Sequence, residues 1–532
     1  MDMELKDLGQ LLQISLPQDG LSRWKSILEE IIPGSIVIQG ANVSEGKDIK
    51  EFIKKAQLIY DDIGIPISRK PLIGITHEGG WISRIHDICN SPGNMALAAT
   101  GSTEYTYSTY RAMGQELSSL GIDWNLAPTV DLNTNPENPI IGVRSFGDNP
   151  EEVSKHARAA CDGLRDAGLL ACAKHFPGHG DTQRDSHLEL PTVHKKLTEM
   201  SHTDLLPYVD LIKHGVDSIM ISHIYYPDIE GGSKPIPASL SEKVVGRLLR
   251  SQMGFDGLVV TDSLSMSAVA ENFPAEVATK MAISAGVDIL ECAKPEYYME
   301  IFHSLQDSVK SGEISANRIG KSLERFNSLR NILSARKSSY FAWPKSILEN
   351  VASASVNAAI TILGKGKLDV GAIKKAGSLN SVFFTRSRLL EEEFSARKTS
   401  PVTEIIKSWG HETHINLVLP RNLPEERIKE NVELLSSKLN AGDFLAVFLN
   451  DSTAYSQSGI EVSPQIRFIK ELLPYFGNRL IAIGTGTPYE ASLLPKDMPY
   501  ISAYSFEQPS LSAAIGVLTG AIPPAGRVPV KI

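Results

Sequence analysis

The alternation of short apolar runs with longer amphipathic segments constrains the fold more than any other feature of the chain. Eight apolar runs read as strands, at residues 9–16, 35–40, 72–78, 122–128, 171–176, 218–223, 258–262 and 288–292. Segments with helical periodicity lie between them, for example 102–119 and 151–166. Such alternation predicts a parallel sheet with right-handed crossovers. Eight units favour a (β/α)8 barrel of the TIM type, although a seven-strand or partly open barrel also fits the pattern.

The alternation resumes in the last third of the chain. Further apolar runs lie at 381–386, 414–420, 444–450, 480–486 and 500–505, with helical stretches between some of them. This pattern predicts a second α/β domain with a doubly wound sheet. We therefore expect an α/β protein with a catalytic barrel at 1–335, a linker at 336–350 and an accessory α/β domain at 351–532.

Charge and composition exclude several classes of partner. The net charge is −9 and the pI about 5.9, so the surface offers no basic field for nucleic acid or anionic lipid. No apolar stretch reaches the length of a membrane span, and the N-terminus has no apolar core of a signal peptide. The four cysteines are scattered, as is typical of reduced thiols. We expect a cytoplasmic protein with no nucleic-acid or membrane partner, whose oligomeric state the sequence does not predict.

Four of the predicted barrel strands become polar only where they end. The residues at these strand ends are His77 with Glu78, Lys174 with His175, His223, and Asp262. Barrel enzymes place their catalytic groups at the carboxyl ends of the strands. A single strand can become polar simply because it leaves the core, but four such strands favour a shared site.

The loop KHFPGHGDTQRDSH, residues 174–187, is dense in titratable groups. In one interpretation Asp185 orients His187, which then transfers protons. In a second, His175, His179, Asp181 and His187 bind a metal such as zinc. In a third, the histidines are polar filler in a loop held by local hydrogen bonds. The residues alone leave all three open.

Long segments of the chain resemble one enzyme family. The loop 174–187 with the following LELPTV, the segment NPIIGVRSFGDNPEEV (138–153) and the segment GFDGLVVTDSLSM (254–266) resemble glycoside hydrolase family 3, in its β-N-acetylglucosaminidase branch. GTGTPYE (484–490), SAYSF and the terminal GAIPPAGRVPV resemble the accessory α/β sandwich that part of this branch possesses. The resemblance thus extends along nearly the whole chain.

The resemblance implies a retaining exo-β-N-acetylglucosaminidase. Such an enzyme releases terminal N-acetylglucosamine from muropeptide or chitin-type oligosaccharides through a covalent glycosyl-enzyme. Asp262 would be the nucleophile, and His187, oriented by Asp185, the general acid and base. Without the resemblance, Asp262 reads equally well as a helix N-cap. The residues implied or placed as sugar contacts are Lys174, His175, Arg144, His77, Glu78 and His223. No metal or other cofactor is implied, and the only partner implied is a small carbohydrate.

One position departs from the family pattern. The branch usually carries Asp-Gln-Glu-Gly-Gly, and its aspartate binds sugar hydroxyls, whereas this chain has Thr76-His77-Glu78-Gly79-Gly80. Losing such a charged contact costs about 1.5–3 kcal/mol of binding. Either His77 or Glu78 replaces it, or the sugar differs. Three alternatives therefore remain: a metal-dependent hydrolase, a phosphorolytic variant, and a sugar-binding homologue with impaired turnover.

Overall fold

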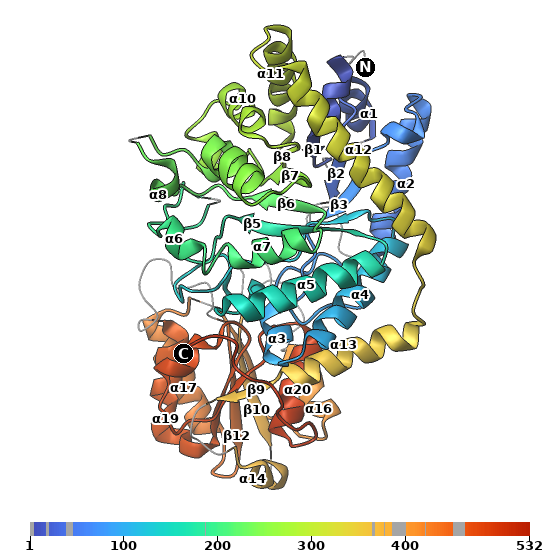
Figure 1. The fold of residues 1–532 in the computed structure, drawn as a ribbon. Coiled ribbons are helices and arrows are strands. Elements are labelled where there is room, and N and C mark those ends of the chain that lie inside the picture. Colours follow the sequence, from blue (N-terminus) through green and yellow to red (C-terminus); the bar gives the residue numbers. More distant parts are fainter. Residues whose placement is uncertain are drawn as a thin grey trace.

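The computed structural model contains a barrel of eight parallel strands, which occupies the upper part of Figure 1. It describes residues 5–16, 21–38, 46–186, 188–232, 234–363, 368–376, 378–385, 401–420, 422–450 and 463–532. The strands are β1 (Leu12–Ile14), β2 (Ser35–Ile38), β3 (Leu72–Ile75), β4 (Trp124–Asn125), β5 (Leu170–Phe176), β6 (Ser218–Ile221), β7 (Leu258–Thr261) and β8 (Leu290–Cys292). Their order is β7-β6-β5-β4-β3-β2-β1-β8, and a parallel bridge between Val260 and Ile289 joins the two ends. The expected (β/α)8 barrel is therefore present.

Helices surround the strands because each presents one apolar side to the barrel. The α-helices are α1 (Leu21–Glu30), α2 (Gly46–Asp62), α3 (Asn94–Ala99), α4 (Thr103–Ser119), α5 (Pro150–Asp166), α6 (Leu197–Met200), α7 (Leu206–Lys213), α8 (Pro227–Glu230), α9 (Ser267–Ala270), α10 (Ala275–Ala285), α11 (Tyr298–Lys310) and α12 (Ala316–Ser339). A π-helix, η5 (Lys243–Gln252), lies between β6 and β7. Helix α5 shows how such a helix is specified: the Asn149 side chain caps it by accepting from the Glu152 amide, and acidic residues occupy its first turn.

Helix α12 closes the amino-terminal end of the barrel. Its apolar side packs against the residues that fill the barrel interior, through Phe326, Leu329 and Leu333. Its basic residues pair with acids that precede alternate strands: Lys337 with Asp123 before β4, Arg336 with Asp217 before β6, and Arg325 with Asp288 before β8. Because this end is covered, a substrate must enter from the carboxyl ends of the strands.

A second, six-stranded sheet forms the lower part of Figure 1. Its strands are β9 (Thr361–Leu363), β10 (Leu379–Phe384), β11 (Asn416–Leu419), β12 (Phe444–Leu449), β13 (Leu480–Gly484) and β14 (Tyr500–Ser502). The order is β11-β10-β12-β13-β14-β9, with β9 alone antiparallel to its neighbour. The helices are α13 (Lys345–Ala359), α14 (Val370–Lys375), α16 (Pro401–Ser408), α17 (Glu425–Lys438), α19 (Pro464–Phe476) and α20 (Gln508–Leu518). One apolar core joins the sheet to α13, α14, α16 and α20, and another joins it to α17 and α19. Helices thus cover both faces, as expected of an α/β sandwich.

The segment between the two sheets is mostly helical. Helix α12 continues to Ser339 and α13 starts at Lys345, so the non-helical connection within the expected linker 336–350 is only residues 340–344. Helix α13 lies beside α4 and α3 of the barrel unit while it also contributes to the core of the second sheet (Figure 1). The chain therefore passes between the two units along a helix that packs on both.

The second unit contacts the loops at the carboxyl ends of the barrel strands. In the loop after β3, Trp81 donates a hydrogen bond from Nε1 to the Thr485 carbonyl oxygen, at 3.1 Å. After β4, the Asn133 side-chain amide donates to the Tyr489 hydroxyl at 2.9 Å. The Arg527 amide donates to the Ala99 carbonyl at 2.7 Å. The second unit therefore contacts the loops at the carboxyl-terminal end of the barrel, the end at which barrel enzymes have their active site.

We expect Tyr489→Phe to weaken this interface. The buried hydroxyl exchanges hydrogen bonds with Asn133, and its loss leaves the Asn133 side-chain amide buried beside a ring. The expected loss is about 1–2 kcal/mol in the free energy of unfolding, measured in urea. The control Tyr475→Phe removes a hydroxyl from a half-exposed tyrosine of the same unit and should leave stability unchanged. Equal effects of the two variants would contradict this role.

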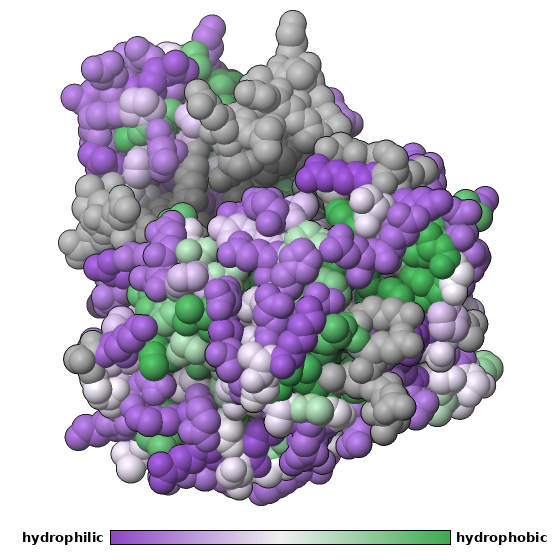
Figure 2. All heavy atoms as spheres, turned by 90° about the horizontal axis from the view of Figure 1, so that it is seen from above, coloured by the Kyte–Doolittle hydropathy of each residue, from purple (hydrophilic) through white to green (hydrophobic). Residues whose placement is uncertain are grey.

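Among the helices that the structure describes, none is both long and apolar enough to cross a lipid bilayer. The face shown in Figure 2 is covered largely by hydrophilic side chains, with apolar patches between them.

Candidate active site

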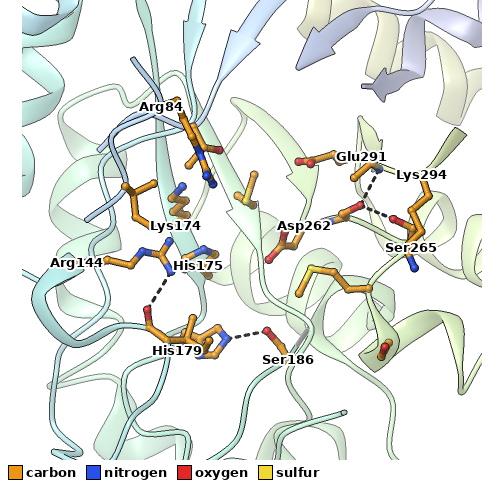
Figure 3. A pocket seen from close by; sticks show the side chains of 18 residues that line it. Arg84, Arg144, Lys174, His175, His179, Ser186, Asp262, Ser265, Glu291 and Lys294 are labelled. Atoms are coloured by element: carbon orange, nitrogen blue, oxygen red, sulfur yellow. Dashed lines mark hydrogen bonds between the residues drawn. The ribbon is translucent and has the colours of Figure 1, made fainter. Parts of the chain in front are cut away.

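A cavity of about 410 Å³ lies where the barrel strands end. That volume suits a single sugar ring, since small-molecule sites start near 300 Å³. Its charged lining residues, most of them at strand ends or in the loops that follow, are Arg84, Arg144, Lys174, Asp262, Glu291 and Lys294 (Figure 3). Thr76, at the end of β3, also lines it. The cavity therefore lies at the end of the barrel where the strand-end residues were expected to meet.

The Glu78 carboxylate bonds to two of the cationic side chains that line the cavity, although Glu78 itself does not line it. Arg144 donates to both of its carboxylate oxygens, at 2.9 and 2.8 Å, and Lys174 Nζ lies 2.8 Å from Oε1. The side chains of Glu78 and Lys174 are each only 2% exposed. Burial alone would raise the pKa of Glu78, but the charges and hydrogen bonds of Arg144 and Lys174 outweigh it and hold that pKa well below its usual range. One carboxylate thus orients two donors toward the cavity.

Asp131 organises the start of the 174–187 loop. Its carboxylate accepts hydrogen bonds from the His175 amide, from the His175 ring nitrogen Nδ1 at 2.8 Å, and from the His179 amide at 2.7 Å. Burial opposes the ionised form, yet His175 and the hydrogen bonds from the loop lower the pKa of Asp131. The His175 ring is therefore held with its other nitrogen turned away from Asp131, and it lines the cavity.

The hydrogen-bond partners of His179, in the same loop, are relevant to the interpretation of the loop as a metal site. His179 Nε2 lies 3.1 Å from the Ser186 hydroxyl and Nδ1 lies 3.1 Å from the Thr182 hydroxyl, so both ring nitrogens have protein partners. Within the described residues, no three histidine, cysteine, aspartate or glutamate side chains are grouped as metal ligands would be. His187 lies outside the described residues. Asp185 is described and partly exposed, and its pairing with His187 stays a prediction.

Asp262 follows β7 directly and faces the cavity (Figure 3). Its Oδ1 accepts a hydrogen bond from the Ser263 amide at 2.8 Å. The next helix, α9, begins only at Ser267 with Met266 at its N-cap position, so Asp262 is not a helix cap. The alternative interpretation of this residue is therefore wrong, and its carboxylate is positioned for a substrate.

The predicted sugar contacts divide into two groups. Lys174, His175 and Arg144 line the cavity, whereas His77, Glu78 and His223 do not. His77 is fully buried, with Nε2 2.7 Å from the Asn90 side-chain oxygen. His223 is also fully buried, and its ring nitrogens lie 2.7 Å from the Ser239 hydroxyl and 2.9 Å from the Ser263 carbonyl. The expectation that these three contact the sugar directly is thus corrected: they support residues that do line the cavity.

Four charged residues of the site were not singled out from the sequence. Glu291 lies in β8 and lines the cavity; the rule that strand ends become polar would have found it in DILEC. Arg84 and Lys294 also line the cavity, and Asp131 lies beneath it, but all three come from loops with no such signal. Loop residues of this kind are identified only once the strands are placed in space.

Three buried histidines predict a loss of stability in acid. Burial lowers the pKa values of His77, His156 and His179 to about 4, against about 6.5 in an unfolded chain. Between pH 6.5 and 4 the unfolded chain therefore binds more protons, so stability falls as the pH falls. Glu291 has the opposite effect. Burial and Asp262 raise its pKa to about 8, so its protonation favours the folded chain as the pH falls and offsets part of the loss of stability. Thermal unfolding between pH 7 and 4.5 measures the slope, and His156→Gln, outside the cavity, should reduce it. A melting temperature constant over this range would contradict the assignment.

Comparison with known proteins identifies the family. Residues 4–329 match the glycosyl hydrolase family 3 N-terminal domain. Beta-hexosaminidase A of Pseudoalteromonas piscicida is 37% identical over 291 residues, 50% of this chain and 48% of that protein, so the chain matches about half of that relative's length. Beta-hexosaminidase LpqI of Mycobacterium tuberculosis is 33% identical over 48% of this chain and 67% of its own length.

A solved structure resembles the whole chain. It is the family 3 beta-N-acetylglucosaminidase from Paenibacillus sp. FPU-7, with a TM-score of 0.86, 29% identity and 99% of both chains covered. The barrel and the α/β sandwich are therefore both shared with it. Because the family match spans more than half of the chain, this protein belongs to glycosyl hydrolase family 3.

Proposed function

We propose that this protein is a retaining exo-β-N-acetylglucosaminidase that acts on the terminal N-acetylglucosamine of muropeptide or chitin-type oligosaccharides. The observation that carries the proposal is the Asp262 carboxylate facing a cavity, of the size of one sugar ring, whose other wall carries Lys174, Arg144 and His175. The names of the family 3 relatives, beta-hexosaminidases and a beta-N-acetylglucosaminidase, support the same class of sugar.

The first chemical step forms a covalent intermediate. The Asp262 carboxylate attacks the anomeric carbon, the glycosidic bond breaks, and the leaving oxygen takes a proton from the acid catalyst. The resemblance to family 3 implies that this acid is His187, with Asp185 as its orienting partner. Water then attacks the anomeric carbon, the same histidine takes a proton from it, and Asp262 is released. Two inversions at one carbon give overall retention.

The cationic wall positions the sugar for this step. Glu78 holds Lys174 and Arg144, so their remaining donors already point into the cavity. Asp131 holds His175 through Nδ1, so the other ring nitrogen of His175 is left for the substrate. Fixed donors bind sugar hydroxyls without losing side-chain entropy on binding. Neither His77 nor Glu78 reaches the cavity to replace the carboxylate that the family usually has at Thr76.

Hydrolysis of 4-nitrophenyl N-acetyl-β-glucosaminide tests the proposal. We expect release of 4-nitrophenol, with little activity on the β-glucoside. From chitin oligomers we expect N-acetylglucosamine and an oligomer that is shorter by one sugar at each step. Proton NMR in the first minutes of reaction should show the β-anomer of the free sugar, the sign of retention.

Each alternative gives a different result in the same assay. Inorganic phosphate should leave the product unchanged, whereas formation of a sugar 1-phosphate would assign phosphorolysis. Activity that is lost to a chelator and restored by zinc would assign a metal-dependent hydrolase. Sugar binding without any turnover over hours would assign an impaired homologue.

A further inference from the structure

The cavity contains a second carboxyl group that the mechanism does not use. Glu291 lies in the middle of β8, is 7% exposed and lines the cavity beside Asp262 (Figure 3). Its Oε2 atom is buried and has no hydrogen-bond partner within the described residues. A buried carboxyl oxygen left without a partner costs free energy, about 1–3 kcal/mol, unless a ligand supplies one.

The strand register places Glu291 level with Asp262. Val260 in β7 pairs with Ile289. Two residues further along each strand the side chains return to the same face, which brings Asp262 and Glu291 side by side on strands about 4.8 Å apart. Hydrogen bonds hold the backbone of Glu291 against the end of β7: its amide donates to the Thr261 hydroxyl at 3.0 Å, and its carbonyl accepts from the Leu264 amide at 2.9 Å. The Asp262 amide donates to the Ile221 carbonyl of β6 at 2.9 Å.

Burial and charge favour the protonated form of Glu291. Removal from water and the neighbouring Asp262 raise its pKa to about 8, while Lys174 on β5 acts in the opposite direction. At neutral pH the group therefore carries a proton that it can donate, as a carboxylate cannot. Beside Asp262, the cavity thus holds a second carboxyl group that can act as a hydrogen-bond donor.

Position argues against Glu291 as the proton donor to the leaving group. In a retaining glycosidase the nucleophile and the acid catalyst flank the glycosidic bond. Asp262 and Glu291 approach the cavity from the same side, while Lys174, His175 and His179 lie across it (Figure 3). We therefore expect Glu291 to face the sugar groups near the anomeric carbon other than the leaving group, namely the ring oxygen and the substituent on C2. A donor to the ring oxygen would oppose the positive charge that this oxygen gains in the transition state.

We propose that Glu291 is a specificity-determining residue that donates its acid proton to an oxygen of the C2 substituent, the carbonyl oxygen in the case of an N-acetyl group. This inference rests on the proposed function and deepens it, because the C2 substituent distinguishes an N-acetylhexosaminide from other glycosides. After β3 this chain has Thr76 where the family usually has an aspartate that binds the sugar. Glu291 would supply a carboxyl contact to the sugar from β8 instead.

Two substitutions and two substrates test the proposal. Glu291→Leu removes the donor, and kcat/KM for 4-nitrophenyl N-acetyl-β-glucosaminide should fall roughly tenfold, the effect of one neutral hydrogen bond. The 4-nitrophenyl 2-deoxy-β-glucoside, which has no C2 substituent, should be hydrolysed equally by wild type and variant. Glu291→Gln keeps a donor, so it should retain activity at pH 7 within about threefold and lose the decline that the wild type shows as the pH rises through about 8.

The leaving group separates the proposed role from acid catalysis. The loss in Glu291→Leu should be the same for N-acetylglucosaminides of 2,4-dinitrophenol and of 4-methylphenol. A larger loss for the poorer leaving group would overturn the proposal and make Glu291 the proton donor, and an equal loss on the 2-deoxy substrate would also overturn it. Glu230→Gln, which alters a buried carboxyl that is bonded to Ser241 outside the cavity, is the matched control and should leave both substrates unaffected.

The proposed function and this inference fail in different ways. Absence of turnover in the wild type refutes the proposed function. In that case calorimetric titration with N-acetylglucosamine still measures whether Glu291→Leu weakens binding roughly tenfold relative to wild type, and unchanged binding would refute the role of Glu291.

Discussion

Asp262→Asn should reduce kcat for the N-acetylglucosaminide on the order of 10⁴-fold or more, as loss of a catalytic nucleophile does in other hydrolases. The amide has the size of the carboxylate and can keep the hydrogen bond from the Ser263 amide to its oxygen. It cannot attack the anomeric carbon at a useful rate. Because the proposed sugar contacts, Lys174, Arg144 and His175, lie across the cavity from Asp262, affinity for N-acetylglucosamine should change far less than kcat. Initial rates and calorimetric titration measure the two quantities.

Chemical trapping identifies the nucleophile independently. A 5-fluoro N-acetylglucosaminyl fluoride slows both steps and should leave a covalent adduct, which peptide mass spectrometry would place on Asp262. A matched control is Ser267→Ala, since Ser267 lines the same cavity and lacks a nucleophilic carboxylate. Activity near the wild-type value in Asp262→Asn, or an adduct on another residue, would remove Asp262 from this role.

Glu78→Ala should have the largest effect on stability. The substitution leaves the buried Arg144 and Lys174 side chains without their shared carboxylate. Breaking a buried ion pair by removing one partner costs about 3–5 kcal/mol, because the remaining charge stays buried. Urea unfolding should show this loss. In protein that still folds, kcat/KM should fall by roughly 10²-fold, since both proposed sugar donors lose the carboxylate that orients them.

An exposed ion pair provides the comparison. Glu430 pairs with Arg427 on α17, and both side chains are more than half exposed. Glu430→Ala should change stability by less than about 1 kcal/mol, because solvent screens such pairs. If Glu78→Ala were no more destabilising than Glu430→Ala, Glu78 could not be the residue that holds Arg144 and Lys174 in place.

Most of the barrel could be predicted because its strands are nearly continuous apolar runs. The residues of β5, for example, are all buried, and parallel strands covered by helices have this composition. Strand β9 was not expected, because it has three residues and pairs only at the edge of its sheet. Most of the expected linker 336–350 is helical, because α12 continues to Ser339 and α13 begins at Lys345.

The site was predictable only in part, for a reason that His223 and Glu291 illustrate. His223 follows β6 and Glu291 lies in β8, yet His223 bonds to Ser239 and Ser263 behind the cavity wall, while Glu291 faces the cavity. A strand pattern indicates that a residue lies at the carboxyl end of the barrel. It does not indicate what lies next to its side chain, because the neighbours come from other strands.

The sequence by itself determined the barrel, the second α/β unit and the group of strand-end residues around the loop 174–187. Periodicity and strand-end polarity are local, so they can be read along the chain. Only the tertiary structure decided that Glu78 holds Arg144 and Lys174 together, that Asp131 orients His175, and that Glu291 lies beside Asp262. These contacts join residues far apart in the chain, and their charges and pKa values depend on burial that only the closed barrel creates.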